Sequence, residues 1–137
     1  MFIEKQIKNS CKKSIGEYGE RIAYQYLKRN KYRILKKNYR EKFDEIDIIA
    51  KSRIECLIFF EVKTINYPED KLINMLSPED NFTISKFRKI KRLCEMFVAK
   101  HKKIINWKVG WRIDLITIEI YETKNKILIK HYKNVYK

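Results

Sequence analysis

Glycine and proline are scarce in this chain, with 3 Gly and 2 Pro in 137 residues. So few turn-forming residues exclude a collagen-like or low-complexity chain, and the lack of any internal repeat argues against a solenoid. No apolar run approaches the ~20 residues that a membrane-spanning helix needs. The N-terminus carries a charge every few residues and lacks the apolar segment of a signal peptide. We therefore expect a cytosolic protein that makes no contact with a membrane.

Cysteine is also scarce, and its three positions, Cys11, Cys56 and Cys94, are widely spaced. An odd number of cysteines cannot pair completely within one chain, and this spacing is not that of a metal site. Cys56 and Cys94 lie in apolar patterns, where a small buried thiol is common. The pattern argues against a disulfide framework and against a zinc or redox role.

Acidic residues are the minority charge: 17 Asp and Glu stand against 32 Lys and Arg, a formal net charge of +15. Such an excess favours binding to phosphates, because lysine and arginine displace the counterions of a nucleic acid. A lysine-rich composition would also result from AT-rich coding whatever the protein does. The charge therefore supports a nucleic-acid partner without identifying one.

The length predicts a single domain, which we place at residues 14–137 after a basic lead-in at 1–13. A first helix is expected from Ser14 to about Asn30, with Ser14 as N-cap and Glu17 completing a capping box. A polar connection is expected at 64–82. The remaining expected elements are strands at 32–35, 45–50 and 54–63, a helix at 83–101, and strands at 111–120 and 127–132. The order α-β-β-β-α-β-β predicts an α/β fold with a mixed sheet flanked by helices.

The hairpin formed by the strands at 45–50 and 54–63 carries the most specific chemical signal. Strand alternation places Glu61 and Lys63 on one face of their strand. On its own strand Asp47 is expected on one face, with Ile46 and Ile48 on the other. The hairpin then brings two carboxylates and a lysine together. Two carboxylates beside a lysine are able to hold Mg²⁺ or Mn²⁺ against a phosphodiester.

Three further points bear on this hypothesis. The apolar run 57–60 predicts a central strand buried on both faces, where carboxylates are costly unless a cation neutralises them. Glu20, on the edge of the first helix's apolar stripe, is a third candidate metal ligand. Lys63 would orient the attacking water and stabilise the transition state. Each has a plainer alternative, since Glu61 and Lys63 also fit a strand-edge ion pair and Glu20 a solvated helix residue.

Other residues are candidates for supporting roles. Arg112 and Asp114, two apart on a strand, fit a structural ion pair that supports the site. The second helix has an outward basic face that is mostly explained by solvation, and Lys86 near its N-terminus is the best phosphate contact. Lys89 and Arg40 are further candidates for nucleic-acid binding. Asp44 and Glu45 either join the acidic cluster or have turn and surface roles.

Four segments together resemble a known family: Gly16–Ala23, Asn38–Arg40, Glu45–Asp47 and Phe60–Lys63. In motif and order they look like the YraN family of small, uncharacterised bacterial proteins. That family is similar to the PD-(D/E)xK, or restriction-endonuclease-like, superfamily and resembles archaeal Holliday junction resolvases. The resemblance covers about residues 15–120 and implies a restriction-endonuclease-like fold. It also implies catalytic positions at Glu20, Asp47, Glu61 and Lys63.

The chain departs from the family pattern at two positions. Asp44 stands where the family usually has glycine, and Ile65 stands where it usually has arginine. The expected function is a Mg²⁺-dependent endonuclease acting on DNA, branched or structured DNA included, and a homodimer is compatible with this. The alternatives are a nucleic-acid-binding module of the same fold that does not cut, and a structural or interaction protein with a relic site.

Overall fold

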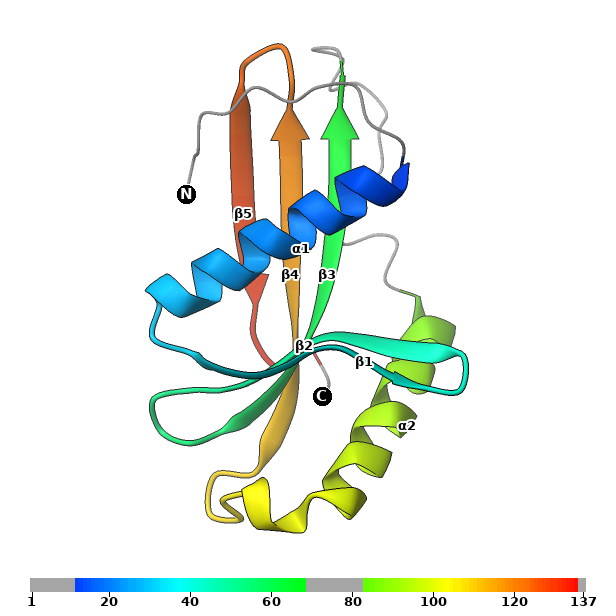
Figure 1. Cartoon of the computed structure of the whole chain (residues 1–137), viewed down its shortest axis with the longest axis vertical. Helices are drawn as coiled ribbons and strands as arrows, with labels where there is room; N and C mark the ends of the chain where they lie inside the picture. The colour runs from blue at the N-terminus through cyan, green and yellow to red at the C-terminus, as the bar shows by residue number, and fades with distance from the viewer. Residues whose placement is uncertain (1–11, 69–82, 136–137) are drawn as a thin grey trace.

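The structure is a computed structural model that describes residues 12–68 and 83–135. Two helices flank a five-stranded sheet (Figure 1). None of the helices in these described ranges is long and apolar enough to cross a membrane. The elements run in the order α1 (Lys12–Arg29), β1 (Arg33–Glu41), β2 (Asp44–Lys51), β3 (Leu57–Tyr67), α2 (Ile84–Lys100), the short 3₁₀ helix η2 (Lys102–Ile104), β4 (Trp111–Tyr121) and β5 (Lys126–Tyr132).

The sheet is mixed, as the sequence predicts. Its strands lie side by side in the order β1-β2-β3-β4-β5. β3 and β4 are parallel, because the chain crosses over through α2 between them, and the other neighbours are antiparallel. β3 is the central strand, and all four residues from Leu57 to Phe60 are fully buried. The predictions of an α/β fold and of a doubly buried central strand are confirmed.

The sheet separates two hydrophobic cores. On one face, α1 packs Ala23 and Leu27 against Phe60 and its neighbours. On the other, α2 packs Phe97 against Phe59, with the two ring centroids 5.6 Å apart. Figure 1 shows α1 crossing β3, β4 and β5, whereas α2 lies beside the ribbon formed by β1 and β2. Each helix therefore holds a different part of the sheet.

The helix ends test the capping predictions. The expectation that Ser14 caps the first helix is wrong, because α1 begins at Lys12 and Ser14 lies inside it. Thr83 does cap α2, and its side chain accepts a hydrogen bond from the Lys86 backbone N–H at 3.2 Å. The predicted lead-in at 1–13 lies outside the described residues except for its last two, which belong to α1.

Two strands continue well past their predicted ends, and one of them, β3, begins at Leu57 and not at residue 54 as predicted. The strand expected at 32–35 extends over Arg33–Glu41, although most of the added residues are polar. Its backbone pairs with β2 along nearly its whole length, so pairing rather than burial holds it. β3 continues to Tyr67 alongside β4, which takes up the first part of the connection expected at 64–82. Residues 69–82 of that connection lie outside the described residues.

The sheet turns sharply at Asp47. The expectation that Ile46 and Ile48 share a face is wrong, because Ile48 belongs to the core beneath α1 and Ile46 to the core beneath α2. The pairing of β1 with β2 places Asn38 opposite Asp47, and Asn38 has a left-handed φ of 52°. A left-handed residue interrupts the pleat. Beyond it the β1–β2 ribbon leaves β3 and extends to the side where α2 lies (Figure 1).

Candidate metal and nucleic-acid site

The candidate site lies at the fork where β2 leaves β3. The two strands pair from Ile48 to Lys51 on β2 and from Leu57 to Phe60 on β3. Beyond Phe60, β3 continues along β4 while β2 turns away. The Val62 backbone N–H donates to Asp47 Oδ2 at 2.8 Å. The Asp47 carboxylate thus occupies the position where strand pairing would otherwise continue.

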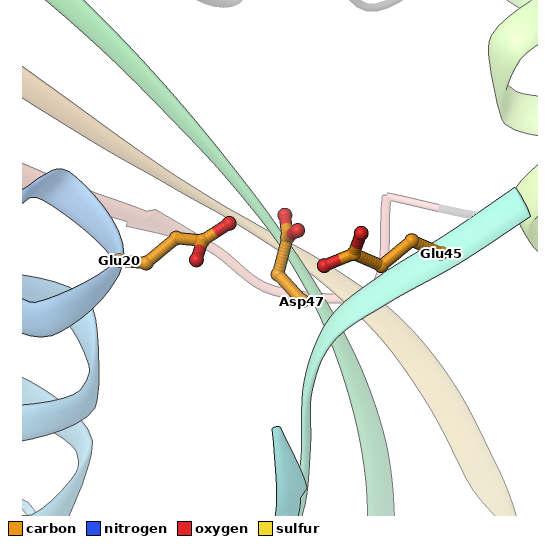
Figure 2. Close-up of side chains that lie close together, drawn as sticks. All are labelled: Glu20, Glu45 and Asp47. Atoms are coloured by element: carbon orange, nitrogen blue, oxygen red, sulfur yellow. The ribbon is translucent and has the colours of Figure 1, made fainter. Parts of the chain in front are cut away.

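Three carboxylates converge at this fork. Glu20 comes from α1, and Glu45 and Asp47 come from β2. One oxygen from each lies within 4.8 Å of the other two. Figure 2 shows the three side chains pointing toward one another from opposite sides of β3. Oxygens gathered this closely are the donors that Mg²⁺, Mn²⁺ or Ca²⁺ takes, so the donor set fits a hard divalent cation.

The electrostatics of the cluster favour a bound proton or cation. Burial, followed by the charge of Glu61, raises the pKa of Asp47 to about 9, against the lowering effect of the Val62 N–H. Burial also raises the pKa of Glu20, and the charges of Glu45 and Glu61 add to this. Asp47 therefore favours a bound proton near neutral pH when no cation is present.

Glu61 of β3 also belongs to the cluster, and two lysine side chains lie beside it. Its side chain is 7% exposed. Burial raises its pKa, while the charge of Lys63 and hydrogen bonds from Lys63 and Asp47 lower it. Lys63 Nζ lies 3.0 Å from Glu61 Oε1, and Lys86 Nζ from α2 lies 3.8 Å from the same oxygen. The structure therefore brings Glu20, Asp47, Glu61 and Lys63 together, with Lys86 beside them.

Asn38 is a member of this site that the residue-by-residue reading of the sequence does not find. Its amide takes the orientation in which Nδ2 donates to Glu45 Oε1 at 2.7 Å and to Glu20 Oε2 at 3.3 Å, because the opposite orientation would face its oxygen toward two carboxylates. A non-glycine residue at positive φ inside a strand is strained. Asn38 does belong to the family-like segment Asn38–Arg40, but that motif gives it no role. Glu45, an open alternative in the sequence, lies in the cluster.

Gly19 sets the distance between α1 and β3, and so places Glu20. A Cβ at this position would lie 1.8 Å from Thr64 Oγ1, which no side chain tolerates. The absence of a side chain lets the helix approach the strand closely. Because Glu20 is the next residue along α1, this close approach brings its carboxylate to the fork.

Hollows open on both sides of the fork. A groove of about 420 Å³ is lined on one wall by β2 and β3, including Glu45 and Glu61, and on the other by α2, including Lys86 and Lys89. A smaller hollow of about 210 Å³ exposes Glu20 and Asp47 beside Asn38. Arg40, predicted to bind nucleic acid, pairs with Glu45 at 3.0 Å (Arg40 Nη2 to Glu45 Oε2) and is largely exposed.

Comparison with known proteins places the chain in a family. The profile of the family described as "Uncharacterised protein family UPF0102" matches residues 19–118. A UPF0102 protein of Clostridium botulinum (strain Kyoto / Type A2) is 36% identical over 127 residues, covering 92% of this chain and 96% of the relative. A UPF0102 protein of Caldicellulosiruptor saccharolyticus is 35% identical over 127 residues, covering 91% and 98%. The chain belongs to the UPF0102 family.

UPF0102 is the YraN family, so the resemblance drawn from the motifs is confirmed. The family description itself names no activity. The matched region contains all the predicted site residues, from Glu20 in α1 to Asp114 in β4. His131, in β5, lies beyond its end.

Within the UPF0102 region, Arg112 and Asp114 form a polar cluster separate from the carboxylates. Arg112 Nε donates to Asp114 Oδ1 at 2.9 Å, and His131 Nε2 lies 2.7 Å from Asp114 Oδ2. Asp114 pairs with Phe60 and shares its face beneath α1. Burial tends to raise the pKa of Asp114, but hydrogen bonds from His131, Arg112 and the Asn134 N–H lower it below its usual range. The predicted ion pair of Arg112 and Asp114 is present within β4, and the contacts of Asp114 with His131 and with the Asn134 N–H join β4 to β5 and to the segment after it.

Proposed function

We propose that this protein is a metal-dependent endonuclease that hydrolyses phosphodiester bonds of DNA, with Mg²⁺ or Mn²⁺ as cofactor. The supporting observation is the convergence of acids from α1, β2 and β3 on one fork, with two lysines beside them. Asp47, Glu20 and Glu61 would hold the cation, and Glu45 completes the donor set. When bound, the cation would lower the pKa of water and neutralise charge that develops on the phosphate.

The side chains of this site have distinct tasks. Lys63, whose Nζ lies 3.0 Å from Glu61 Oε1, would orient the attacking water and stabilise negative charge in the transition state. Lys86 faces the groove from α2 and would hold a phosphate oxygen. Asp47 must lose its proton before it can act as a ligand, so metal binding and deprotonation are coupled.

The cost of this arrangement supports a chemical role over a relic. Enclosing several carboxylates raises their pKa values, which means that the ionised forms are destabilised in the folded protein. A protein retains such a destabilising arrangement most readily where the carboxylates serve a function. The competing proposal is a nucleic-acid-binding module of the same fold. It is favoured by Ile65, which lines a third hollow together with Glu20 and Lys63 and offers no charge to a phosphate.

The test is cleavage of plasmid DNA and of labelled linear and branched oligonucleotides with Mg²⁺, with Mn²⁺ and with chelator. We expect nicking that requires the metal. Glu61→Gln and Lys63→Ala should each lower the rate by about 10²-fold or more, and circular dichroism should show that both variants are folded at the assay temperature.

A matched control comes from the exposed ion pair of Lys91 and Glu95 on α2, 3.7 Å apart. Glu95→Gln and Lys91→Ala remove the same groups from a surface outside the site and should leave cleavage unchanged. Cleavage that survives in the Glu61 and Lys63 variants would assign the activity to a contaminant. DNA binding without any cleavage in the wild type would favour the non-catalytic module.

A further inference from the structure

Phe43 is an exposed aromatic side chain at the rim of the 420 Å³ groove. It lies at the tip of the hairpin between β1 and β2 and is 102% exposed, more than any other large apolar residue in the described ranges. The same groove is lined by Glu45 and Glu61 of the carboxylate cluster. A large apolar ring held wholly in water contributes nothing to the core, and its place at the rim of the groove beside the carboxylate cluster makes it available to a ligand.

The geometry of the turn does not explain a phenylalanine there. Glu41 and Asp44 pair across the hairpin, which leaves Lys42 and Phe43 as a two-residue loop. Such loops favour glycine, asparagine and aspartate. Lys42 has a left-handed φ of 56°, so the loop adopts a conformation that its residues do not favour. The turn tolerates Phe43 without requiring it.

The hairpin is anchored to α2, so the backbone that carries Phe43 stands at a defined place relative to that helix. Lys100, at the end of α2, forms an ion pair with Glu41, and the Tyr39 hydroxyl donates to Glu41 Oε1 at 2.8 Å. The Tyr39 ring packs edge-on against Phe97 of α2, with ring centroids 5.1 Å apart. These contacts join the hairpin to the helix that forms the opposite wall of the groove.

The two walls of the groove offer complementary chemistry. Lys86 and Lys89 of α2 present positive charge to a phosphate backbone, and Phe43 lines the same groove from the hairpin tip. The groove is also lined by the acids Asp44, Glu45 and Glu61, whose charge the proposed cation would offset. With the cation bound, lysines and an aromatic side chain in one groove suit single-stranded nucleic acid, because an unpaired base stacks on the ring while its phosphates meet the lysines. In an intact duplex the faces of the bases are already stacked on one another and are closed to Phe43.

From this geometry we infer that the groove takes a DNA strand with an unpaired base, which stacks on Phe43 while its phosphate lies at the carboxylate cluster. Phe43 is a specificity-determining residue, and the substrate class is DNA with a single-stranded segment. This inference rests on the proposed function, because it takes the cluster as the place where the strand is cut.

The experiment compares the binding of a labelled oligo-dT single strand with that of a duplex of the same length, in Ca²⁺. Phe43→Ala should weaken single-strand binding by about 5- to 150-fold, the effect of losing one stacked base, and should change duplex binding little. Phe43→Trp should retain the single-strand affinity, because tryptophan also stacks. The matched control is Ile54→Ala, which removes another exposed apolar side chain, 67% exposed, that does not line the groove. Since both side chains are exposed, both variants should fold.

The outcomes separate this inference from the proposed function. Phe43→Ala that binds the single strand as the wild type does, or that loses single strand and duplex equally, overturns the role of Phe43. If the wild type cuts both forms alike and Phe43→Ala is unaffected, the nuclease proposal stands and this inference fails. If no DNA is cut with Mg²⁺ while Phe43→Ala still weakens single-strand binding alone, the nuclease proposal fails and the stacking platform stands.

Discussion

Asp47 connects the stability of the protein to the chemistry of its site. Its carboxyl is buried among the other acids, so its pKa is raised to about 9 and the protonated form is favoured below that pH, although the hydrogen bond from the Val62 N–H works against this. In the unfolded chain the same carboxyl ionises near pH 4. The folded state therefore binds a proton that the unfolded state has released over this interval, and Asp47 makes the protein less stable as pH rises from about 4 to about 9.

This difference predicts the behaviour of Asp47→Asn. Asparagine keeps an oxygen for the Val62 N–H but has no proton to lose, so in chelator its melting temperature should exceed that of the wild type by an amount that grows as pH rises from about 4 to about 9. Thermal unfolding followed by circular dichroism across this range measures the effect. With Mn²⁺ or Mg²⁺ the wild type should gain stability and the variant should not, because binding to the folded state alone stabilises it. Parallel pH curves for the two proteins would contradict the shifted pKa.

For Asp114 we expect the opposite dependence of stability on pH. Its pKa is lowered in the folded protein, so its contribution to stability is present above the ordinary pKa of an aspartate, near 4, and is lost as pH falls through the lower folded value. Asp114→Asn leaves Arg112 and His131 without their anion and should cost about 3–5 kcal/mol at pH 7, measured by urea denaturation. A loss well below 1 kcal/mol would show that the cluster is not a significant support of β4 and β5.

The sequence predicts which acids form the site better than it predicts their arrangement in space. Asp47, Glu61 and Lys63 follow from an apolar hairpin that carries charges in a two-residue period. Asn38 escapes that reasoning, because its role depends on a left-handed backbone that breaks the pleat. The role of Glu45 stayed open in the sequence. Regular strand alternation does not predict the sharp turn at Asp47 that brings Glu45 into the cluster. Catalysis by these residues stays a prediction.

The contact between α1 and β3 gives a prediction with an internal control, because α1 contains two glycines. Gly19→Ala would place a methyl group 1.8 Å from Thr64 Oγ1, so the helix must move outward. We expect a loss of about 1–3 kcal/mol in the free energy of unfolding and a displaced Glu20. Gly16→Ala meets nothing within 4 Å and should be neutral or stabilise by up to about 1 kcal/mol, as expected for alanine in a helix.

A second-site variant identifies the cause. Thr64→Ala removes the Oγ1 atom that the new methyl group would strike, so it should recover part of the stability that Gly19→Ala loses; the Thr64 Cβ at 2.9 Å still leaves a close contact. Chemical denaturation of both single variants and the double variant measures this coupling. Additive losses would mean that the close approach at Gly19 does not position α1.

Helices and buried strands were predictable because burial marks them in the sequence. α2 begins directly after Thr83 and shows its apolar stripe, and β3 shows an apolar run. The predicted range of β1 was too short because Lys36 and Lys37 are exposed and polar, and because the strand is held by pairing with the backbone of β2. An edge strand held by main-chain hydrogen bonds leaves little trace in side-chain patterning. The turn of the β1–β2 ribbon away from β3 has the same origin.

The net charge of +15 raises the question of whether nucleic acid is bound by the groove or by the surface as a whole. General attraction depends on total charge, whereas a defined site depends on where the charges lie. Lys86 and Lys89 line the groove beside Glu61. Lys102 and Lys103 are exposed in η2 and line none of the hollows at the fork. Replacing either pair with alanine lowers the net charge equally.

We therefore expect the two double variants to differ in their salt dependence. For single-stranded DNA, the slope of log affinity against log salt should fall in magnitude by about 0.7 for each phosphate that a lysine no longer neutralises, so by about 1.4 for Lys86→Ala with Lys89→Ala. Lys102→Ala with Lys103→Ala should keep a slope close to that of the wild type. Fluorescence anisotropy titrations at several salt concentrations give both slopes. Equal changes in the slopes of the two double variants would mean that the chain acts as a general polycation and that the groove is not the binding site of the DNA backbone.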